Sequence, residues 1–251
     1  YDLVNIRDFA FDKHKTCDDA PYGGGAGQLL LPEPLGRALE SVEAYKKSTH
    51  VVYVTPSGVP FTQKKALALS QKENIVFICG RYEGIDQRII DLYVDEEISV
   101  GDFVMSSGEL AATVIIDAVY RLVDGVITQE SLSEESFSDN LLEYPQYTRP
   151  NVYQGLAVPA VLTEGNHEEI RKWRLRKSLQ KTLKNRPDLI AEAYKGGLLS
   201  EEAKKIIEEL TDFVSYKNDR KKAKELRTIR EKSKRQNSSI QETSYGLNKD
   251  N

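Results

Sequence analysis

The chain has 251 residues, enough for one large domain or two modest ones with a sizeable core, which excludes a fibre or a small disulfide scaffold. Its charge is divided along the chain. Residues 1–163 carry 13 Lys and Arg against 24 Asp and Glu, a net charge of −11, while residues 164–251 carry 22 against 15, a net charge of +7. An acidic body with a basic C-terminal third makes nucleic acid a candidate partner of that third.

The remaining composition sets further bounds. No apolar run approaches the roughly 18 residues of a membrane-spanning helix, so we expect no membrane partner. Cys17 and Cys79 are too few for a disulfide framework, and we expect both to be buried as small hydrophobic side chains in a reducing, cytoplasmic location. His14, His50 and His167 have no Cys or carboxylate at ligand spacing, so we predict no zinc site.

Strand-like apolar runs alternate with helix-compatible stretches in the first half of the chain, which predicts an α/β sheet. The strand-like runs are residues 3–6, 51–54, 75–79 and 98–104. The helical stretches between them are residues 35–47, 62–73 and 84–93. Ser106–Glu109 then forms a predicted capping box, and a buried helix is expected over 109–123. Because the chain opens on Tyr1 and almost at once on a strand-like run, we expect its natural start to be missing.

Composition changes after this helix, because residues 128–139 are polar, acidic and rich in serine, as is typical of a linker. We therefore predict a first domain, a flexible linker, a small all-α domain and a basic, disordered tail. Their expected bounds are 1–127, 128–142, 143–215 and 216–251.

In the second domain, Asn166 is expected to cap a helix that includes residues 171–183, with further helices at 188–194 and 200–213. The tail segment 217–235 carries ten cations against three anions. Such an end either binds nucleic acid without specificity or has no specific partner.

Three loops begin where apolar strands stop, at Tyr53–Gly58, Cys79–Gly84 and Val100–Glu109. Ligands of α/β sheets bind outside such strand ends, and glycines let a ligand approach the backbone so that peptide groups can read an adenine-like edge. The alternative is that these glycines only make turns, and composition alone does not name a ligand. Neither the phosphate-loop nor the dinucleotide glycine motif is matched. The glycine run Pro21–Gly27 is either a flexible loop or a place where backbone meets substrate.

The predicted helix over 171–186 contains eight cations and no anion, with Trp173, Leu175, Leu179 and Leu183 left to pack inward. A solvated face normally mixes charges of both signs. We therefore favour phosphate binding over a merely solvated face, because cationic helices gain affinity by neutralising phosphates.

Taken together, six motifs in this order closely resemble the bacterial tRNA (guanine-N1)-methyltransferases, the TrmD family of the trefoil-knot SPOUT superfamily. The resemblance covers the chain from Leu3 to about Leu199. Its motifs are Pro-Tyr-Gly-Gly-Gly-Ala-Gly at 21–27, Cys-Gly-Arg-Tyr-Glu-Gly from 79, Ser-Val-Gly-Asp-Phe-Val-Met-Ser-Ser-Gly-Glu-Leu from 99, Asp-Ala-Val-Tyr-Arg at 117–121, Tyr-Pro-Gln-Tyr-Thr-Arg-Pro at 144–150, and Gly-Asn-His-Glu-Glu-Ile-Arg-Lys-Trp-Arg-Leu from 165.

The resemblance implies a deep trefoil knot that holds S-adenosylmethionine in a bent shape, a homodimer, and tRNA as substrate. The expected reaction is methylation of N1 of the guanine immediately 3′ of the anticodon. The family further suggests that a divalent ion such as Mg²⁺ assists. The residues that the resemblance assigns to the cofactor are Tyr53, Thr55, Pro56, Gly80, Tyr82, Glu83, Gly84, Val100, Gly101, Met105 and Gly108.

For catalysis, the resemblance matches Arg121 to the family's active-site arginine and Glu135 to its proposed general-base aspartate. The chemistry suits the pair, because guanine N1 carries a proton that a carboxylate can remove while a cation stabilises charge on O6. The family implies that the base comes from the other subunit of the dimer. By residue type alone, Arg121 would be an ordinary helix-end cation and Glu135 a solvated linker charge.

The chain departs from the family pattern at several positions. Glu135 is one methylene longer than aspartate, a shift of up to roughly 1.5 Å, and misplacements near ~1 Å can cost about 10²-fold in rate. Glu143 also replaces an aspartate and is a second candidate base. Ser107 replaces a glycine and would crowd the ligand if the position needs a positive φ. Gln28 stands where the family has methionine, and the family's first strand and helix are absent.

These departures motivate an alternative, a tRNA-binding protein that keeps the fold and has lost catalysis. A third hypothesis is a nucleotide-binding α/β protein with a basic tail. The leading hypothesis is the methyltransferase.

Overall fold

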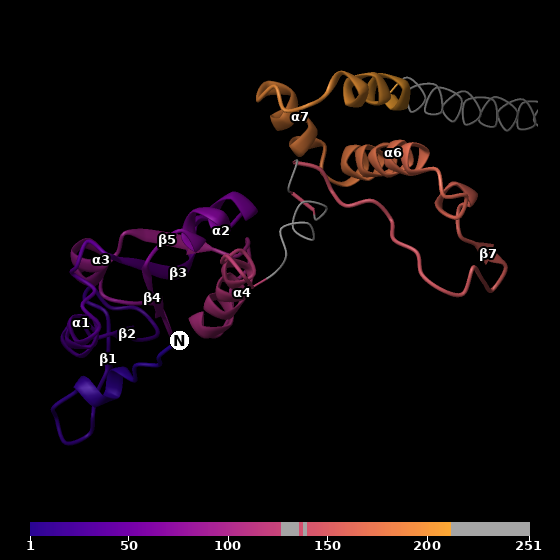
Figure 1. Ribbon diagram of the computed structural model, residues 1–251. Helices are drawn as coiled ribbons and strands as arrows, with labels where there is room; N and C mark the ends of the chain where they lie inside the picture. The colour runs from indigo at the N-terminus through magenta and orange to yellow at the C-terminus, as the bar shows by residue number, and fades with distance from the viewer. Residues whose placement is uncertain (127–135, 138–139, 212–251) are drawn as a thin grey trace, which may run out of the picture. The chain divides into compact units, whose positions relative to one another are not determined.

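The computed structural model describes residues 1–126, 136–137 and 140–211 (Figure 1). The chain divides into two compact units, Tyr1–Ser131 and Leu132–Asn251. The first unit is α/β, and the described part of the second is mainly helical. In the described part of the chain, no helix combines the length and the apolar character needed to cross a membrane.

The first unit is built on a parallel sheet with the strand order β4-β3-β5. Its strands are β3 (Thr49–Pro60), β4 (Asn74–Cys79) and β5 (Glu96–Ser99). In β3, Val51 and Tyr53 belong to one hydrophobic cluster and Val52 and Val54 to another, because successive side chains of a strand point to opposite faces. Both faces are buried, which explains why this strand is an unbroken apolar run.

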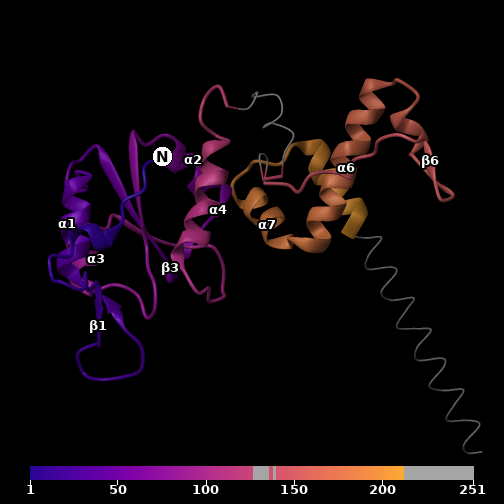
Figure 2. The same ribbon diagram turned by 90° about the horizontal axis from the view of Figure 1, so that it is seen from below.

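Helices cover the two faces of this sheet, so the predicted α/β alternation is confirmed (Figures 1 and 2). Leu39 of α1 and Ile89 of α3 pack in the cluster of Val51, while Leu69 of α2 and Ile115 of α4 pack in the cluster of Val52. The helices are α1 (Pro32–Ser41), α2 (Gln63–Ser70), α3 (Gln87–Tyr93) and α4 (Gly108–Tyr120).

The predicted strand at residues 3–6 is wrong. The side chain of Asn5 accepts a hydrogen bond from the backbone N–H of Arg7 at 3.1 Å and caps a short 3-10 helix, η1 (Ile6–Phe9). Leu3 is exposed, so burial gives no reason for a strand here. A small antiparallel pair, β1 (Asp18–Asp19) with β2 (Leu29–Leu30), follows instead.

Two helix starts differ from the predicted ones for local reasons. The predicted helix over 35–47 begins at Pro32, whose fixed φ suits the first turn of a helix. The helix predicted from residue 84 begins only at Gln87, because Gly84 has a φ of +122° and Asp86 caps the helix. The Asp86 carboxylate accepts from the Arg88 N–H at 2.9 Å.

The region between β5 and α4 also departs from prediction. The strand predicted over 98–104 ends at Ser99, because its hydroxyl accepts from the N–H of Gly101 at 3.2 Å and Gly101 turns the chain with a φ of +155°. The predicted capping box is wrong as well. Ser107, not Ser106, is the N-cap of α4 and makes no side-chain capping bond within the described residues. Glu109 pairs instead with Arg81, which lies outside the helix.

β3 contains an irregularity that the sequence pattern did not predict. Val54 and Val59 both pair with Ile98 of β5, so the residues between them bulge out and the strand then continues to Pro60. The first predicted loop is therefore a bulge within a strand. At Gly58 an added Cβ would lie 2.5 Å from the backbone N of Ile98, so only glycine fits this close approach.

We expect Gly58→Ala to destabilise the protein by about 1–3 kcal/mol, because the added methyl group overpacks rigid backbone of β5. Thermal or urea unfolding measures the loss. Ser57→Ala, in the same bulge but at an exposed side chain, is the matched control and should leave stability within about 0.5 kcal/mol of the unmodified protein. Equal stability of the two variants would show that the bulge yields without cost.

The second unit packs its helices around a core of Leu179, Ile190, Ala193, Leu199, Ala203 and Leu210. The predicted cap of α6 is confirmed, because the Asn166 side chain accepts from the N–H of Glu169 at 3.3 Å. The helices are α6 (His167–Asn185), α7 (Pro187–Lys195) and the helical residues 201–211.

The prediction that this unit is all-α needs correction. β6 (Val152–Tyr153) and β7 (Leu156–Ala157) form an antiparallel hairpin, followed by a 3-10 helix, η2 (Ala160–Leu162). Gln154 and Gly155 both have positive φ values, as a two-residue hairpin turn requires. The predicted tail 216–251 lies outside the described residues.

Candidate active site

A pocket of about 230 Å³ lies where the bulge of β3 and the ends of β4 and β5 meet. The structure brings all eleven residues that the sequence assigned to the cofactor to the wall of this one pocket. They are Tyr53, Thr55, Pro56, Gly80, Tyr82, Glu83, Gly84, Val100, Gly101, Met105 and Gly108.

Further residues of the same segments line the pocket, but the sequence analysis did not assign them to the cofactor. Their position next to assigned residues in the sequence could have indicated them. They are Val54, Arg81, Ile98, Ser99, Phe103, Val104, Ser106, Ser107 and Ala111.

The loop after β4 is fitted closely around the Tyr53 ring. A Cβ added at Gly80 would lie 3.0 Å from the Tyr53 hydroxyl, and one at Gly84 would lie 3.1 Å from it. Gly84 also has a φ of +122°, which side chains rarely adopt. Burial raises the pKa of Tyr53, so its hydroxyl stays protonated near neutral pH. Glycine at positions 80 and 84 therefore lets the backbone of this loop lie close to the Tyr53 ring.

The loop after β5 returns to pack on the end of β4. The N–H of Gly108, at the start of α4, donates to the carbonyl of Gly80 at 3.0 Å. An added Cβ at Gly108 would lie 2.9 Å from the Cα of Cys79. Ser107, the residue before it, is extended with a φ of −158°. The position therefore needs no positive φ, and the expected conformational objection to serine there does not apply.

An ion pair joins the loop after β4 to the start of α4. The Arg81 guanidinium donates to the Glu109 carboxylate at 2.8 and 3.2 Å, joining the loop after β4 to the first turn of α4. Burial acts to raise the pKa of Glu109, but the hydrogen bonds, that from Arg81 foremost, outweigh it and leave this pKa below its ordinary value. Both side chains are largely exposed, so the pair contributes little to stability.

The glycine run ends against the same pocket wall. Gly23, Gly24, Gly25 and Gly27 all have positive φ values. A Cβ added at Gly27 would lie within 2.8 Å of the Glu83 side chain. The backbone N–H of Glu83 donates to the carbonyl of residue 28 at 3.0 Å. An added Cβ at Gly23, Gly24 or Gly25 would meet nothing within 4 Å, so both alternatives for this run stay predictions.

The two cysteines have little nucleophilic character. Cys17 is buried as predicted, and Cys79 is partly buried where β4 enters the pocket loop. Burial raises the pKa of the Cys79 thiol to about 11 and also raises that of Cys17. Among the described residues, no three His, Cys, Asp or Glu side chains gather as a metal site.

The proposed catalytic residues do not join this pocket within the described part of the chain. Arg121 is the C-cap of α4, thirteen residues beyond Gly108, which places it about 20 Å along the helix from the pocket end. Glu135 lies outside the described residues. Glu143, the second candidate base, belongs to the second unit, where its backbone N–H donates to the Ser136 hydroxyl at 3.0 Å.

Comparison with known proteins places these features in one family. The tRNA (Guanine-1)-methyltransferase TrmD family matches residues 1–192. Among similar proteins are the tRNA (guanine-N(1)-)-methyltransferases of Treponema denticola, 68% identical over 82% of this chain and 84% of the relative, and of Treponema pallidum, 58% identical over 84% and 83%. That of Borrelia duttonii is 63% identical over 75% of this chain and 79% of the relative. The chain therefore belongs to the tRNA (guanine-1)-methyltransferase TrmD family.

Proposed function

We propose that this protein transfers a methyl group from S-adenosylmethionine to N1 of the guanine immediately 3′ of a tRNA anticodon. The observation that carries the proposal is the convergence of all eleven assigned cofactor residues on one pocket of a chain that belongs to the TrmD family. S-adenosylmethionine supplies an electrophilic methyl group on a sulfonium centre.

The pocket suits this cofactor because four of its lining residues, Gly80, Gly84, Gly101 and Gly108, are glycines, at which a ligand can approach the backbone closely. Backbone groups at such positions can read an adenine edge. Met105 and Phe103 add apolar surface. These residues bind and orient the donor so that the target nitrogen needs only in-line placement.

The protein's own acid–base chemistry falls to Glu135 and Arg121. Guanine N1 carries a proton, so we assign Glu135 to accept it as the N1–carbon bond forms and the carbon–sulfur bond breaks. Arg121 stabilises the negative charge that grows on O6. Magnesium remains a prediction, with no ligand set assigned.

A homodimer completes this site in our proposal. Leu110 and Val114, one helical turn apart on α4, are 60% and 56% exposed, although the sequence predicted them to be buried. Tyr120, the last residue of α4, is exposed as well. Leu110, Val114 and Tyr120, the α4 patch, are apolar surface that a second copy would cover. Because Arg121 lies far along α4 from its own pocket, we infer that it serves the pocket of the partner subunit.

We also propose the family's trefoil knot for the first unit. The contact of Gly108 with Gly80 supports it, because the chain after β5 returns across the end of β4. Cytoplasmic location is proposed from the reaction, since tRNA is the substrate.

The function is tested by incubating the full chain with methyl-labelled S-adenosylmethionine and a tRNA transcript. Label should enter the transcript, and a guanine-to-adenine change at the target position should abolish it. Tight tRNA binding without any incorporation would instead establish the alternative, a tRNA-binding protein without catalysis.

We expect Val114→Glu to convert the dimer to a monomer, because a buried, unpaired carboxylate is costly at an apolar interface. Light scattering should show the halved mass, and methyl transfer should fall at least about 10²-fold as the shared site is lost. Leu67→Glu is the matched control, because it also replaces an exposed apolar side chain by glutamate, but on α2 and outside the α4 patch. A fully active monomer would contradict the shared site.

A further inference from the structure

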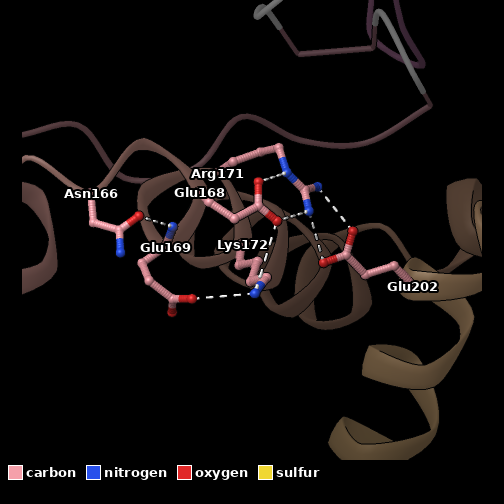
Figure 3. A network of polar contacts seen from close by, with 6 residues as sticks. All are labelled: Asn166, Glu168, Glu169, Arg171, Lys172 and Glu202. Carbon is pink, nitrogen blue, oxygen red and sulfur yellow. Dashed lines mark hydrogen bonds and ion pairs between the residues drawn. The ribbon is translucent and has the colours of Figure 1, made fainter.

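Seven of the eight cations in residues 171–186 fall into two sets by their contacts. The first set is held by carboxylates. Arg171 is hydrogen-bonded to Glu168 at 2.9 Å and to Glu202 at 2.9 Å, so it links the first turn of α6 to the helical residues 201–211 (Figure 3). Lys172 pairs with Glu169 at 3.2 Å (Figure 3).

Two more cations complete the first set. Arg176 pairs with Glu209 at 2.6 Å, and Arg186, the C-cap residue of α6, pairs with Asp188 at 2.5 Å. The sequence showed a helix without anions, but the fold supplies its anions from the first turn of α6 and from neighbouring segments. A further cation of the helix, Arg174, lies over the Tyr144 ring at 4.8 Å.

The second set is Lys177, Lys181 and Lys184, which we call the lysine stripe. Within residues 1–126, 136–137 and 140–211, no carboxylate forms an ion pair with any of the three. Their spacing of four and three residues places them on one face of α6, over about 10 Å of helix. Lys181 Nζ donates to the backbone carbonyl of Glu143 at 3.0 Å, a contact that leaves its charge unneutralised.

An aromatic pair lies one helical turn from the stripe. The rings of Trp173 and Tyr147 are 6.3 Å apart at an angle of 56°, and Lys177 Nζ lies 5.9 Å from the Trp173 ring. Tyr147 is 50% exposed. Cations beside an accessible aromatic ring are the combination by which proteins hold a nucleic-acid strand, with phosphates on the cations and a base on the ring.

We infer that the lysine stripe, and not the paired cations of the same helix, makes the phosphate contacts of α6 with tRNA. The inference rests on the proposed function and specifies its RNA surface. A phosphate that approaches Arg171 or Arg176 meets a carboxylate already in place, which repels it and has already neutralised the arginine. A lysine of the stripe can neutralise an RNA phosphate, which releases the cations condensed on the RNA, and this release is a main source of affinity.

Two triple variants of the full chain test this inference at equal net charge. The stripe variant is Lys177→Gln, Lys181→Gln, Lys184→Gln, and the matched control is Arg171→Gln, Arg176→Gln, Arg186→Gln. Each removes three positive charges, so any long-range effect on tRNA is the same. Binding of an unmodified tRNA transcript is measured by filter retention over a series of salt concentrations.

In the stripe variant, the slope of log affinity against log salt should become shallower by about 2, because each lost phosphate contact removes ~0.7–0.9 from it. The Kd of this variant should rise tenfold or more at ~0.1 M salt. In the control, the slope should become shallower by less than about 1. A variant with arginine in place of all three lysines keeps the charges and should bind tRNA as the unmodified chain does. The affinity for S-adenosylmethionine should stay unchanged in every folded variant.

Equal losses in the two variants, or normal tRNA binding by the stripe variant, would overturn the inference. The readout is tRNA binding, which needs no methyl transfer. Failure of the stripe and failure of the proposed reaction are therefore distinguished, because the unmodified chain is assayed for both.

Discussion

Glu135→Gln is expected to lower the rate of methyl transfer to tRNA by about 10²- to 10⁴-fold, the range that a general base contributes. The amide keeps the size and polarity of the side chain but cannot accept the guanine N1 proton. The affinity for S-adenosylmethionine should not change, because the eleven pocket residues are untouched. Single-turnover rates with saturating cofactor measure the first effect, and titration calorimetry measures the second.

The matched control is Glu143→Gln, which makes the same chemical change at the second candidate base. Glu143 is held in the second unit by Ser136 and by Lys181, whose Nζ donates to its backbone carbonyl. We expect this variant to retain most of the rate. A large loss in Glu143→Gln with an unimpaired Glu135→Gln would transfer the role of base to Glu143. Glu135→Asp, which keeps a carboxylate, should be far more active than Glu135→Gln.

The pocket could be predicted from sequence because its chemistry is local. Glycine at Gly80, Gly84, Gly101 and Gly108, directly after apolar strands, marks places where backbone must come close to something. The family resemblance then supplied the ligand and the roles of single residues, which spacing alone did not give. The types of β3, β4, β5 and α1 to α4 followed from periodicity, while the strand predicted at residues 3–6 did not form. The ends of the elements were shifted by local capping groups such as Asp86.

Features that depend on tertiary partners could not be predicted in this way. The bulge before Gly58 depends on its register with β5, and the exposure of Leu110 and Val114 depends on what else covers α4. The charge pattern shows the same limit. Eight cations without an anion suggested a uniformly basic helix, but carboxylates from distant positions, such as Glu202 and Glu209, neutralise one side of it. The excess of basic residues in 164–251 therefore indicates an RNA-binding surface only when the cations held in ion pairs are left out of the count.

Mixed dimers of two inactive variants are expected to regain methyl transfer if each site is shared between subunits. Gly84→Val should abolish cofactor binding, because its side chain would be strained at a φ of +122° and would press on the Tyr53 hydroxyl. Glu135→Gln should lower methyl transfer about 10²- to 10⁴-fold. In the heterodimer, the site with the intact pocket would receive the intact base of the other subunit. With random assortment, half of the dimers are mixed and each has one working site, so activity should reach about a quarter of the unmodified level.

The matched control places both substitutions in one chain and mixes it with unmodified protein. In a shared arrangement, both sites of that heterodimer are defective, and only the unmodified homodimers remain active. If each site were instead built within one chain, the outcomes would be reversed: the two single variants would stay inactive on mixing, and the control heterodimer would keep one active site. Repeating the first mixture with Arg121→Ala in place of Glu135→Gln tests the cation separately. Because Arg121 lies about 20 Å along α4 from Gly108, we expect the mixture of Gly84→Val and Arg121→Ala chains to regain activity as well.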